Sequence, residues 1–324
     1  MTDHNILAVV QKVAKPLYNI VKVTGPFLLA QSKTAVENYS DFKLNKARLE
    51  AISTLLQEEA KNISEDRAKL RDKIINTKGL ERARAQDDYN LLTKELNKLS
   101  TIDKVKDFIS DDEIINVDRE ISDEWIDRFN QLASSLNEPW RKQLLANAFS
   151  CELKQPGSVT FIILNCIASF DERAFRLFGF LVNSSIRMYE VNILPEIEGN
   201  KRFEVDGKEY SMNSLMYYLN HLNLIKNDGN GTISMESSKN KDVYLRYGRR
   251  VLKMSYPTSP VPLWHRIGMI YFTTLGNDIA KFYSRETNSF GNENFDKFIL
   301  EAKDKQYTYT EIEMSEELFL ELGI

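Results

Sequence analysis

The sequence predicts a mainly α-helical protein with a smaller α+β domain near its C-terminal end. Over the first half of the chain, apolar residues recur at helical spacing with few prolines or glycines between them. Nearer the C-terminal end, two short segments rich in β-branched and aromatic residues flank a glycine, which is typical of a β-hairpin. We expect five parts: an amphipathic N-terminal helix (1–30), a coiled-coil helical hairpin (31–110), a central helical bundle (118–190), an α+β domain (196–285) and an acidic C-terminal tail (286–324).

The composition limits the classes of function. With 324 residues, of which 42% are hydrophobic, the chain is long enough for two or three domains with sizeable cores. Its formal net charge of -4 argues against a protein that binds polyanions over its whole surface, so any nucleic-acid contact needs a local basic patch. The two cysteines and three histidines lie at no metal-binding spacing, so we expect neither a metal nor another cofactor.

The first segment has the pattern of an amphipathic helix. Its apolar positions recur every three or four residues, with lysines between them. Such a helix either lies on an anionic membrane surface or packs against its own domain or a partner subunit, and the second outcome is the more common. The residues predicted to make one of these contacts are Val9, Val13, Leu17 and Ile20 on the apolar side and Lys12, Lys15 and Lys22 on the basic side.

The same segment predicts neither a signal peptide nor a membrane-spanning helix. Lysines and the Gly25-Pro26 pair interrupt its apolar run, and no small-residue cleavage site follows it. We therefore expect a cytoplasmic protein, with a peripheral position at the inner membrane as the alternative.

Residues 41–98 predict two long helices. Charged residues, alanine and leucine dominate this segment, which contains one glycine and no proline. Leu49, Leu56, Ile63 and Leu70 recur at every seventh position, as they do along a coiled-coil seam. Gly79 suits a helix end because glycine adopts positive φ angles at little cost. The segment predicts an antiparallel hairpin or a dimeric coiled coil, and its expected role is oligomerisation or spacing.

The central segment predicts short antiparallel helices with defined starts. Ser122 and Asp171 each precede an apolar helical pattern and suit the N-cap position. Asp123 and Glu124 add negative charge to the first helical turn, where the helix dipole favours it. Short loops between such helices favour a compact bundle.

Three motifs in this region resemble a known family. They are an acidic helix start that includes Trp125, the turn from Glu152 to Ser158, and a second acidic helix start after Asp171. Together they resemble the uncharacterised bacterial family called domain of unknown function 2806 (DUF2806), which is distantly similar to the alpha class of abortive-infection proteins. The resemblance implies a sensor or effector in antiphage defence. The motif residues to which it gives a structural role are Trp125, Glu152, Pro156, Gly157 and Ser158.

Glu152 has two interpretations. A carboxylate beside this turn suits catalysis only if a second carboxylate, a histidine or a nucleophile has a spacing that pairs with it, and none has. We therefore expect Glu152 to accept hydrogen bonds from backbone amides or an arginine and to hold the turn. The chain also departs from the family pattern, because Leu145 stands where a tryptophan is usual and Trp140 is offset from that position.

The C-terminal part is similar to bacterial winged-helix domains. A helix is predicted from residue 212 to 225, followed by a β-hairpin over residues 242–254, a strand over 267–272 and a closing helix over 273–282. The predicted recognition helix carries neither arginine nor lysine, so nucleic-acid binding is open but not favoured. The basic residues of the hairpin segment that suit phosphate contact are Lys239, Lys241, Arg246, Arg249, Arg250 and Lys253.

The leading functional prediction is a non-enzymatic, helical interaction and oligomerisation protein. The chain has no phosphate-binding glycine loop, serine-hydrolase elbow, zinc motif or cluster of nuclease carboxylates. Its expected partner is a second copy of itself or another protein, and its expected setting is the antiphage defence that the resemblance implies. The alternative is a DNA-binding regulator that uses the winged helix, and a third hypothesis is an enzyme whose site residues are scattered along the sequence.

Overall fold

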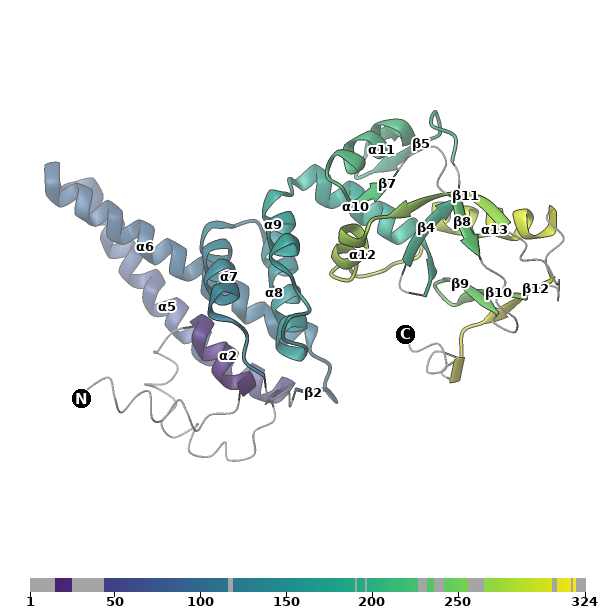
Figure 1. Ribbon diagram of the computed structural model, residues 1–324. Coiled ribbons are helices and arrows are strands. Elements are labelled where there is room, and N and C mark those ends of the chain that lie inside the picture. Colours follow the sequence, from purple (N-terminus) through teal and green to yellow (C-terminus); the bar gives the residue numbers. More distant parts are fainter. Residues whose placement is uncertain are drawn as a thin grey trace. The chain divides into compact units, whose positions relative to one another are not determined.

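The chain forms a mixed α+β protein of two compact units, Met1–Ser169 and Phe170–Ile324 (Figure 1). This computed structural model describes residues 15–24, 44–115, 119–189, 191–195, 197–226, 232–235, 242–255, 265–304, 308–315 and 317–318. We call the first unit the helical unit and the second the sheet unit. Their boundary falls inside the range 118–190 predicted for the central bundle, so the helix that Asp171 caps belongs to the sheet unit.

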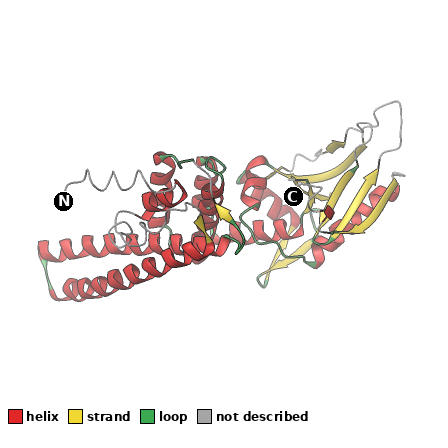
Figure 2. Cartoon of the chain, turned by 90° about the horizontal axis from the view of Figure 1, so that it is seen from below, coloured by secondary structure: helices red, strands yellow, loops and turns green. Residues whose placement is uncertain are grey.

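Two long helices, α5 (Lys46–Asn76) and α6 (Gly79–Asp103), form the predicted helical hairpin (Figure 2). The side chain of Asn45 accepts a hydrogen bond from the amide of Arg48 at the start of α5, and Gly79 adopts a φ of 60° at the connection. Leu49 and Leu56 are buried, whereas the later seam residues are only half-buried. The half of the hairpin near its connection therefore contributes little to the core.

The short helix α2 (Lys15–Thr24) packs against α6 and against α7 (Asp123–Ser135). Ile20 is only 1% exposed, and Lys22 forms a 2.6 Å ion pair with Asp123. The apolar side chains of α2 whose burial is described, Ile20 and Val21 among them, thus pack within their own unit, and Val9, Lys12 and Val13 lie outside the described residues. Among the helices that the structure describes, none combines the length and apolar character needed to cross a membrane.

Aromatic side chains fill the core of the helical unit. The ring of Trp125 stacks on Phe129 at a centroid distance of 5.4 Å, and Phe129 lies 4.9 Å from the ring of Phe149. Ser122 accepts a hydrogen bond from the amide of Trp125, which confirms it as the N-cap. The other elements of this unit are β1 (Leu44–Asn45), the 3-10 helix η1 (Lys104–Phe108), β2 (Ile114–Ile115), α8 (Pro139–Lys154) and α9 (Phe161–Ser169).

The sheet unit is built on an eight-stranded antiparallel sheet with the strand order β12-β10-β9-β3-β4-β11-β7, in which β8 also pairs with β11. A separate hairpin is formed by β5 (Arg202–Val205) and β6 (Lys208–Ser211). The sheet strands are β3 (Ile186–Met188), β4 (Val191–Pro195), β7 (Ile225–Lys226), β8 (Thr232–Met235), β9 (Val243–Tyr247), β10 (Arg250–Ser255), β11 (His265–Phe272) and β12 (Thr308–Glu313). The helices are α10 (Glu172–Ser184), α11 (Met212–His221), α12 (Thr274–Ala280) and α13 (Ser289–Asp304).

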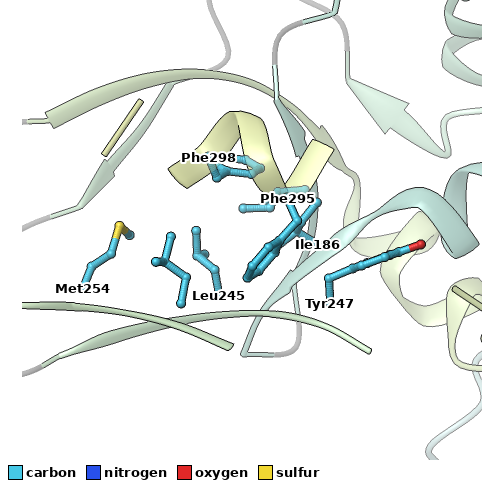
Figure 3. Close-up of a cluster of buried hydrophobic side chains, with 8 residues drawn as sticks. Ile186, Leu245, Tyr247, Met254, Phe295 and Phe298 are labelled. Carbon is cyan, nitrogen blue, oxygen red and sulfur yellow. The ribbon is translucent and has the colours of Figure 1, made fainter. Parts of the chain in front are cut away.

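One face of the sheet forms a hydrophobic core with α13. Figure 3 shows Phe295 and Phe298 of this helix together with Ile186, Leu245 and Met254 of the strands. Successive side chains of a strand point to opposite faces. Because Ile186 and Leu245 point toward α13, the next residue of each strand projects from the other face, and in both strands that residue is an arginine.

The C-terminal elements differ in part from their predictions. The hairpin β9–β10 forms where it was predicted, but it lies inside the sheet between β3 and β12 rather than projecting as a two-stranded wing. The predicted helix from residue 212 ends at His221, and Ile225 belongs to β7. The segment predicted as an acidic tail provides α13 and the edge strand β12, and the strand was not expected.

Candidate anion-binding site

Strand register brings two arginines directly opposite each other. Arg187 of β3 pairs with Arg246 of β9, and on its other side Arg187 pairs with Asn192 of β4. Residues paired in this way project from the same face of a sheet and lie within reach of each other. Like charges in such positions destabilise a sheet. This face therefore concentrates positive charge at a cost in stability.

A third arginine reaches the same place from the connection between α12 and α13. Arg285 donates a hydrogen bond from Nη2 to Oδ1 of Asn192. Asn192 is 2% exposed, and its own amide nitrogen donates to Oδ1 of Asn277 at 2.7 Å. The hydroxyl of Ser185 lies 3.2 Å from the same Asn192 oxygen. A buried polar network thus fixes the position of the Arg285 guanidinium.

The three arginines line one recess of about 210 Å³, which we call the arginine recess. Arg187 and Arg246 are half-buried, and the Arg285 side chain is accessible to solvent inside the recess. The buried residues Val182 and Ser185 also line it. The remaining lining residues are Asn183, Tyr247, Gly248, Glu286 and Thr287.

The electrostatics of the recess are dominated by the arginines. Burial and the neighbouring charges of Arg187 and Arg246 lower the pKa of Arg285 to about 10, so its guanidinium is still charged at neutral pH. Burial, together with Arg187, also lowers the pKa of Arg246. The C-terminal end of α10 lies at the recess, but a helix terminus supplies only about half of a negative charge.

The wall that carries Arg285 is held in place by hydrogen bonds. The Tyr247 hydroxyl donates to the carbonyl of Asn183 at 2.9 Å and accepts from the amide of Asn288 at 2.7 Å. The amide of Glu286 donates to the Asn183 side chain at 3.2 Å. A Cβ atom added at Gly248 would lie 2.7 Å from the Thr287 side chain, so the β9–β10 turn lies close to this wall. The recess is therefore formed before any ligand binds.

The basic residues predicted from the sequence do not gather into one surface. Of the four residues among these that the structure describes, Arg246 alone lines the recess. Arg250 forms ion pairs with Asp296 at 2.8 Å and with Glu311 at 2.7 Å, and Lys253 pairs with Asp242 at 2.8 Å. Arg249 is exposed in the β9–β10 turn, whereas Lys239 and Lys241 lie outside the described residues.

The motif residues in the helical unit hold a turn. Glu152 accepts hydrogen bonds from the amides of Gly157 at 2.6 Å and Val159 at 2.9 Å, which confirms the structural role expected for it. Burial of this carboxylate raises its pKa, although the hydrogen bonds from the turn oppose the shift. Trp125 donates from its ring nitrogen to the carbonyl of Val159, and Ser158 donates to that of Cys151. Pro156 lies in the same turn.

A second polar cluster lies at the base of the helical hairpin. The hydroxyl of Ser53 donates to Asp103, and the ammonium group of Lys106 lies 2.5 Å from the Ser53 oxygen and 3.0 Å from Asp103. The adjacent cavity measures about 10 Å³, which is room for roughly one water molecule and no substrate. The cluster joins α5 to η1. Within the described ranges, no three His, Cys, Asp or Glu side chains are grouped so that they would hold a metal ion.

Two of the three recess arginines were missed by sequence reasoning. Arg187 and Arg285 are 98 residues apart (285 minus 187), and the sheet register that joins the first to Arg246 is not visible in the sequence. A usable signal does exist for the strand pair. Arg187 and Arg246 each stand between two apolar or aromatic residues of a strand segment, where a charged side chain is uncommon.

Comparison of the chain with protein-family models, with curated proteins and with solved structures finds no match. The family resemblance of the three motifs therefore stays a prediction, and the functional argument rests on the geometry of the recess.

Proposed function

We propose that this chain is a non-enzymatic binding protein whose sheet unit holds an anionic ligand in the arginine recess. The observation that carries the proposal is the convergence of Arg187, Arg246 and Arg285 on one preformed recess. A guanidinium group presents several N–H donors in a rigid fork that matches carboxylate and phosphate oxygens. A bound anion would offset the repulsion among the three charges.

The non-enzymatic part of the proposal is supported by the other lining residues. Among the described residues that line the recess there is neither histidine nor cysteine. The Ser185 hydroxyl lies beside the Asn192 amide oxygen, which is not a base. A binding role requires only the arginines and the fixed walls.

The helical unit supplies the interaction part of this proposal. Ile75 is 72% exposed and Leu80 is 68% exposed, both where the two hairpin helices connect. We propose that this end of the hairpin contacts a second copy of the chain or a protein partner. In the antiphage setting that the resemblance implies, the bound anion would be the signal. The helical unit would transmit that signal to the second copy or the protein partner.

The DNA-binding alternative is less well supported by the geometry. Arg250 and Lys253 already pair with carboxylates, which leaves Arg249 as the exposed cation of the described hairpin. If the chain binds DNA as a winged-helix protein does, Arg249→Gln should lower its affinity for duplex DNA and make that affinity depend less on salt concentration.

A pair of matched variants tests the proposed function. Arg285→Gln and Arg249→Gln each remove one positive charge, but only Arg285 lines the recess. Sulfate at a concentration of one hundred times its dissociation constant is expected to stabilise the wild-type protein by about 2.7 kcal/mol, relative to chloride at equal ionic strength. We expect Arg249→Gln to keep this thermal shift and Arg285→Gln to lose it. Equal shifts in both variants would place the anion elsewhere.

A further inference from the structure

We propose that the connected end of the helical hairpin, residues 71–84, binds an anionic lipid surface. We call this segment the hairpin end. Its two exposed apolar side chains enter the interface between lipid headgroups and acyl chains, and the basic side chains around them contact lipid phosphates. The inference goes beyond the proposed function, because it gives the hairpin end a partner that is not a protein, and it does not depend on the arginine recess.

The hairpin end is exposed on all sides. It extends past the other described helices of its unit (Figures 1 and 2), and all but two of its residues are exposed. The buried residues of α5 fall between Leu49 and Leu56, near the opposite end of that helix. Ile75 and Leu80 stand on either side of the connection and are 72% and 68% exposed. Within the described part of the chain, both side chains are therefore open to a partner.

Basic residues predominate in the hairpin end. Five basic and two acidic residues give it a net charge of +3 (5 minus 2). These residues are Arg71, Lys73, Lys78, Arg82, Arg84, Asp72 and Glu81. Lys73 pairs with Glu81 at 3.5 Å, and among the described residues no carboxylate lies within ion-pair distance of the other four basic side chains. The end therefore presents positive charge that can attract an anionic surface.

Acidic residues become frequent only farther from the connection. They are Glu65 and Asp66 on α5 and Asp87 and Asp88 on α6. Asp87 is eight positions beyond Gly79 (87 minus 79), which is about 12 Å along a helix that rises about 1.5 Å per residue. The Debye length at physiological ionic strength is about 8 Å. These carboxylates therefore weaken the attraction between the hairpin end and an anionic surface only slightly.

The arrangement of the charges fits a surface that the hairpin meets end-on. Two of the basic residues lie on α5, one lies in the connection and two lie on α6. Arg82 and Arg84 are two positions apart, so they project from nearly opposite sides of α6, because a helix has about 3.6 residues per turn. The positive charge therefore surrounds the hairpin end instead of forming a stripe along one face of it.

The combination of exposed apolar and basic side chains favours a lipid surface over a nucleic acid. Each lysine or arginine near an anionic membrane strengthens binding about fivefold. Apolar side chains add to this attraction when they leave water for the boundary between headgroups and acyl chains. The phosphates of a nucleic acid would use the basic residues alone and would leave Ile75 and Leu80 in water. A lipid surface is the partner that uses both features.

Sedimentation of the full chain with lipid vesicles tests the inference. The probes are vesicles of phosphatidylcholine alone and vesicles of phosphatidylcholine mixed with anionic phosphatidylglycerol, at physiological ionic strength. We expect the wild-type chain to bind only the mixed vesicles. Arg82→Gln combined with Arg84→Gln should weaken this binding about 25-fold, at about fivefold for each charge. Ile75→Ser combined with Leu80→Ser should weaken it as well, because the apolar contribution is lost.

Matched control variants make the same kinds of change elsewhere on the hairpin. Lys61→Gln combined with Lys94→Gln removes two positive charges at exposed positions, and Leu91→Ser removes an apolar side chain that is 59% exposed. Both controls should bind the mixed vesicles as the wild-type chain does. All of the substituted side chains are exposed, so thermal unfolding should be nearly unchanged in every variant.

Three results overturn the inference. The first is a wild-type chain that does not bind the mixed vesicles, and the second is an equal loss of binding in the control variants. The third is binding to duplex DNA that is tighter than binding to the vesicles and depends on Arg82 and Arg84 but not on Ile75 and Leu80, which would identify a nucleic acid as the partner.

The lipid contact and the proposed protein contact are tested by separate measurements. Both contacts use Ile75 and Leu80, so one excludes the other at a given moment. The mass of the chain in solution without vesicles reports on contact with a second copy, and sulfate binding reports on the arginine recess. A failure of the lipid inference therefore leaves both parts of the proposed function as they were.

Discussion

At the scale of single residues, the arginine recess contains a conflict between stability and binding. Arg187 and Arg246 oppose each other across two strands, and Arg285 is held beside them by the buried amide of Asn192. Repulsion of this kind persists in a folded protein when the surrounding structure stabilises it, and it is typical of sites that bind a ligand of opposite charge. The free energy of unfolding should therefore change in a predictable direction when one of these charges is removed.

We expect Arg285→Gln to stabilise the protein when no anion is bound. The change removes one of three like charges, and substitutions that improve surface charge commonly contribute roughly 0.5–2 kcal/mol. Urea denaturation at low ionic strength measures the free energy of unfolding. The gain should shrink at high salt, because dissolved ions screen the repulsion. A destabilised variant would mean that the hydrogen bond from Arg285 to Asn192 outweighs the repulsion.

Glu152 gives a second prediction at this scale. Its two carboxylate oxygens each accept a backbone amide of the turn, from Gly157 and Val159. Glu152→Gln replaces one acceptor with an NH₂ donor, so one buried amide loses its partner at a cost of about 1–3 kcal/mol. Thermal unfolding measures this loss. Glu58→Gln, at an exposed position of α5, is the control and should change stability little.

The sequence allowed good predictions for residues whose partners are close along the chain. Ser122 caps the helix that begins at the next residue, and Asp171 accepts a hydrogen bond from the amide of Ala174 three positions later. Arg285 could not be placed in this way, because Asn192 is its partner from a distant strand. Local capping chemistry is visible in a sequence, whereas a site assembled by sheet register is not.

At the scale of secondary-structure elements, the same distinction separates β9–β10 from β12. The first two strands form a hairpin around Gly248, so a short sequence determines their pairing. The strand β12 pairs with β10, which lies more than fifty residues earlier, and its glutamates predicted part of an acidic tail rather than a strand. Its strand conformation depends on a partner that the local sequence does not specify.

The junction between α12 and the strand β7 yields a prediction at this scale. A Cβ atom added at Gly276 would lie 1.9 Å from the backbone oxygen of Leu224, and this oxygen also accepts a hydrogen bond from the amide of Thr273. Gly276→Ala must therefore push α12 away from this segment, at a cost of about 1–3 kcal/mol or more. Chemical denaturation measures the cost. Thr274→Ala, at an exposed position of the same helix, should lie within about 0.5 kcal/mol of wild type.

At the scale of the whole molecule, each unit carries one part of the proposed function: the sheet unit binds the anion and the helical unit contacts a partner. Every residue of the arginine recess belongs to the sheet unit, and the helical hairpin belongs to the other unit. The sequence predicted the hairpin well, because α5 and α6 contact mainly each other and their pattern is local. It did not predict where the units divide, because the series of short helices continues across Ser169 and Phe170 without a composition change.

The oligomeric state is the prediction that concerns the whole molecule. If the hairpin joins two copies, its exposed apolar side chains near the connection provide the contact, and Ile75→Asp combined with Leu80→Asp should convert an oligomer into a monomer. Both side chains are largely exposed, so the change should leave thermal unfolding of the chain itself almost unaffected. Light scattering coupled to size-exclusion chromatography, over a range of protein concentrations, measures the mass.

A matched control separates the loss of apolar contact from the added charge. Asn76→Asp combined with Lys78→Gln changes the charge by the same two units at exposed positions between Ile75 and Leu80 and removes no apolar side chain, so it should keep the mass of the wild-type protein. A loss of mass in this control as well would assign the effect to charge repulsion. A wild-type chain that is monomeric at every concentration would show that the hairpin, despite its heptad spacing, does not join copies of the chain, and would leave its exposed end to a different protein partner.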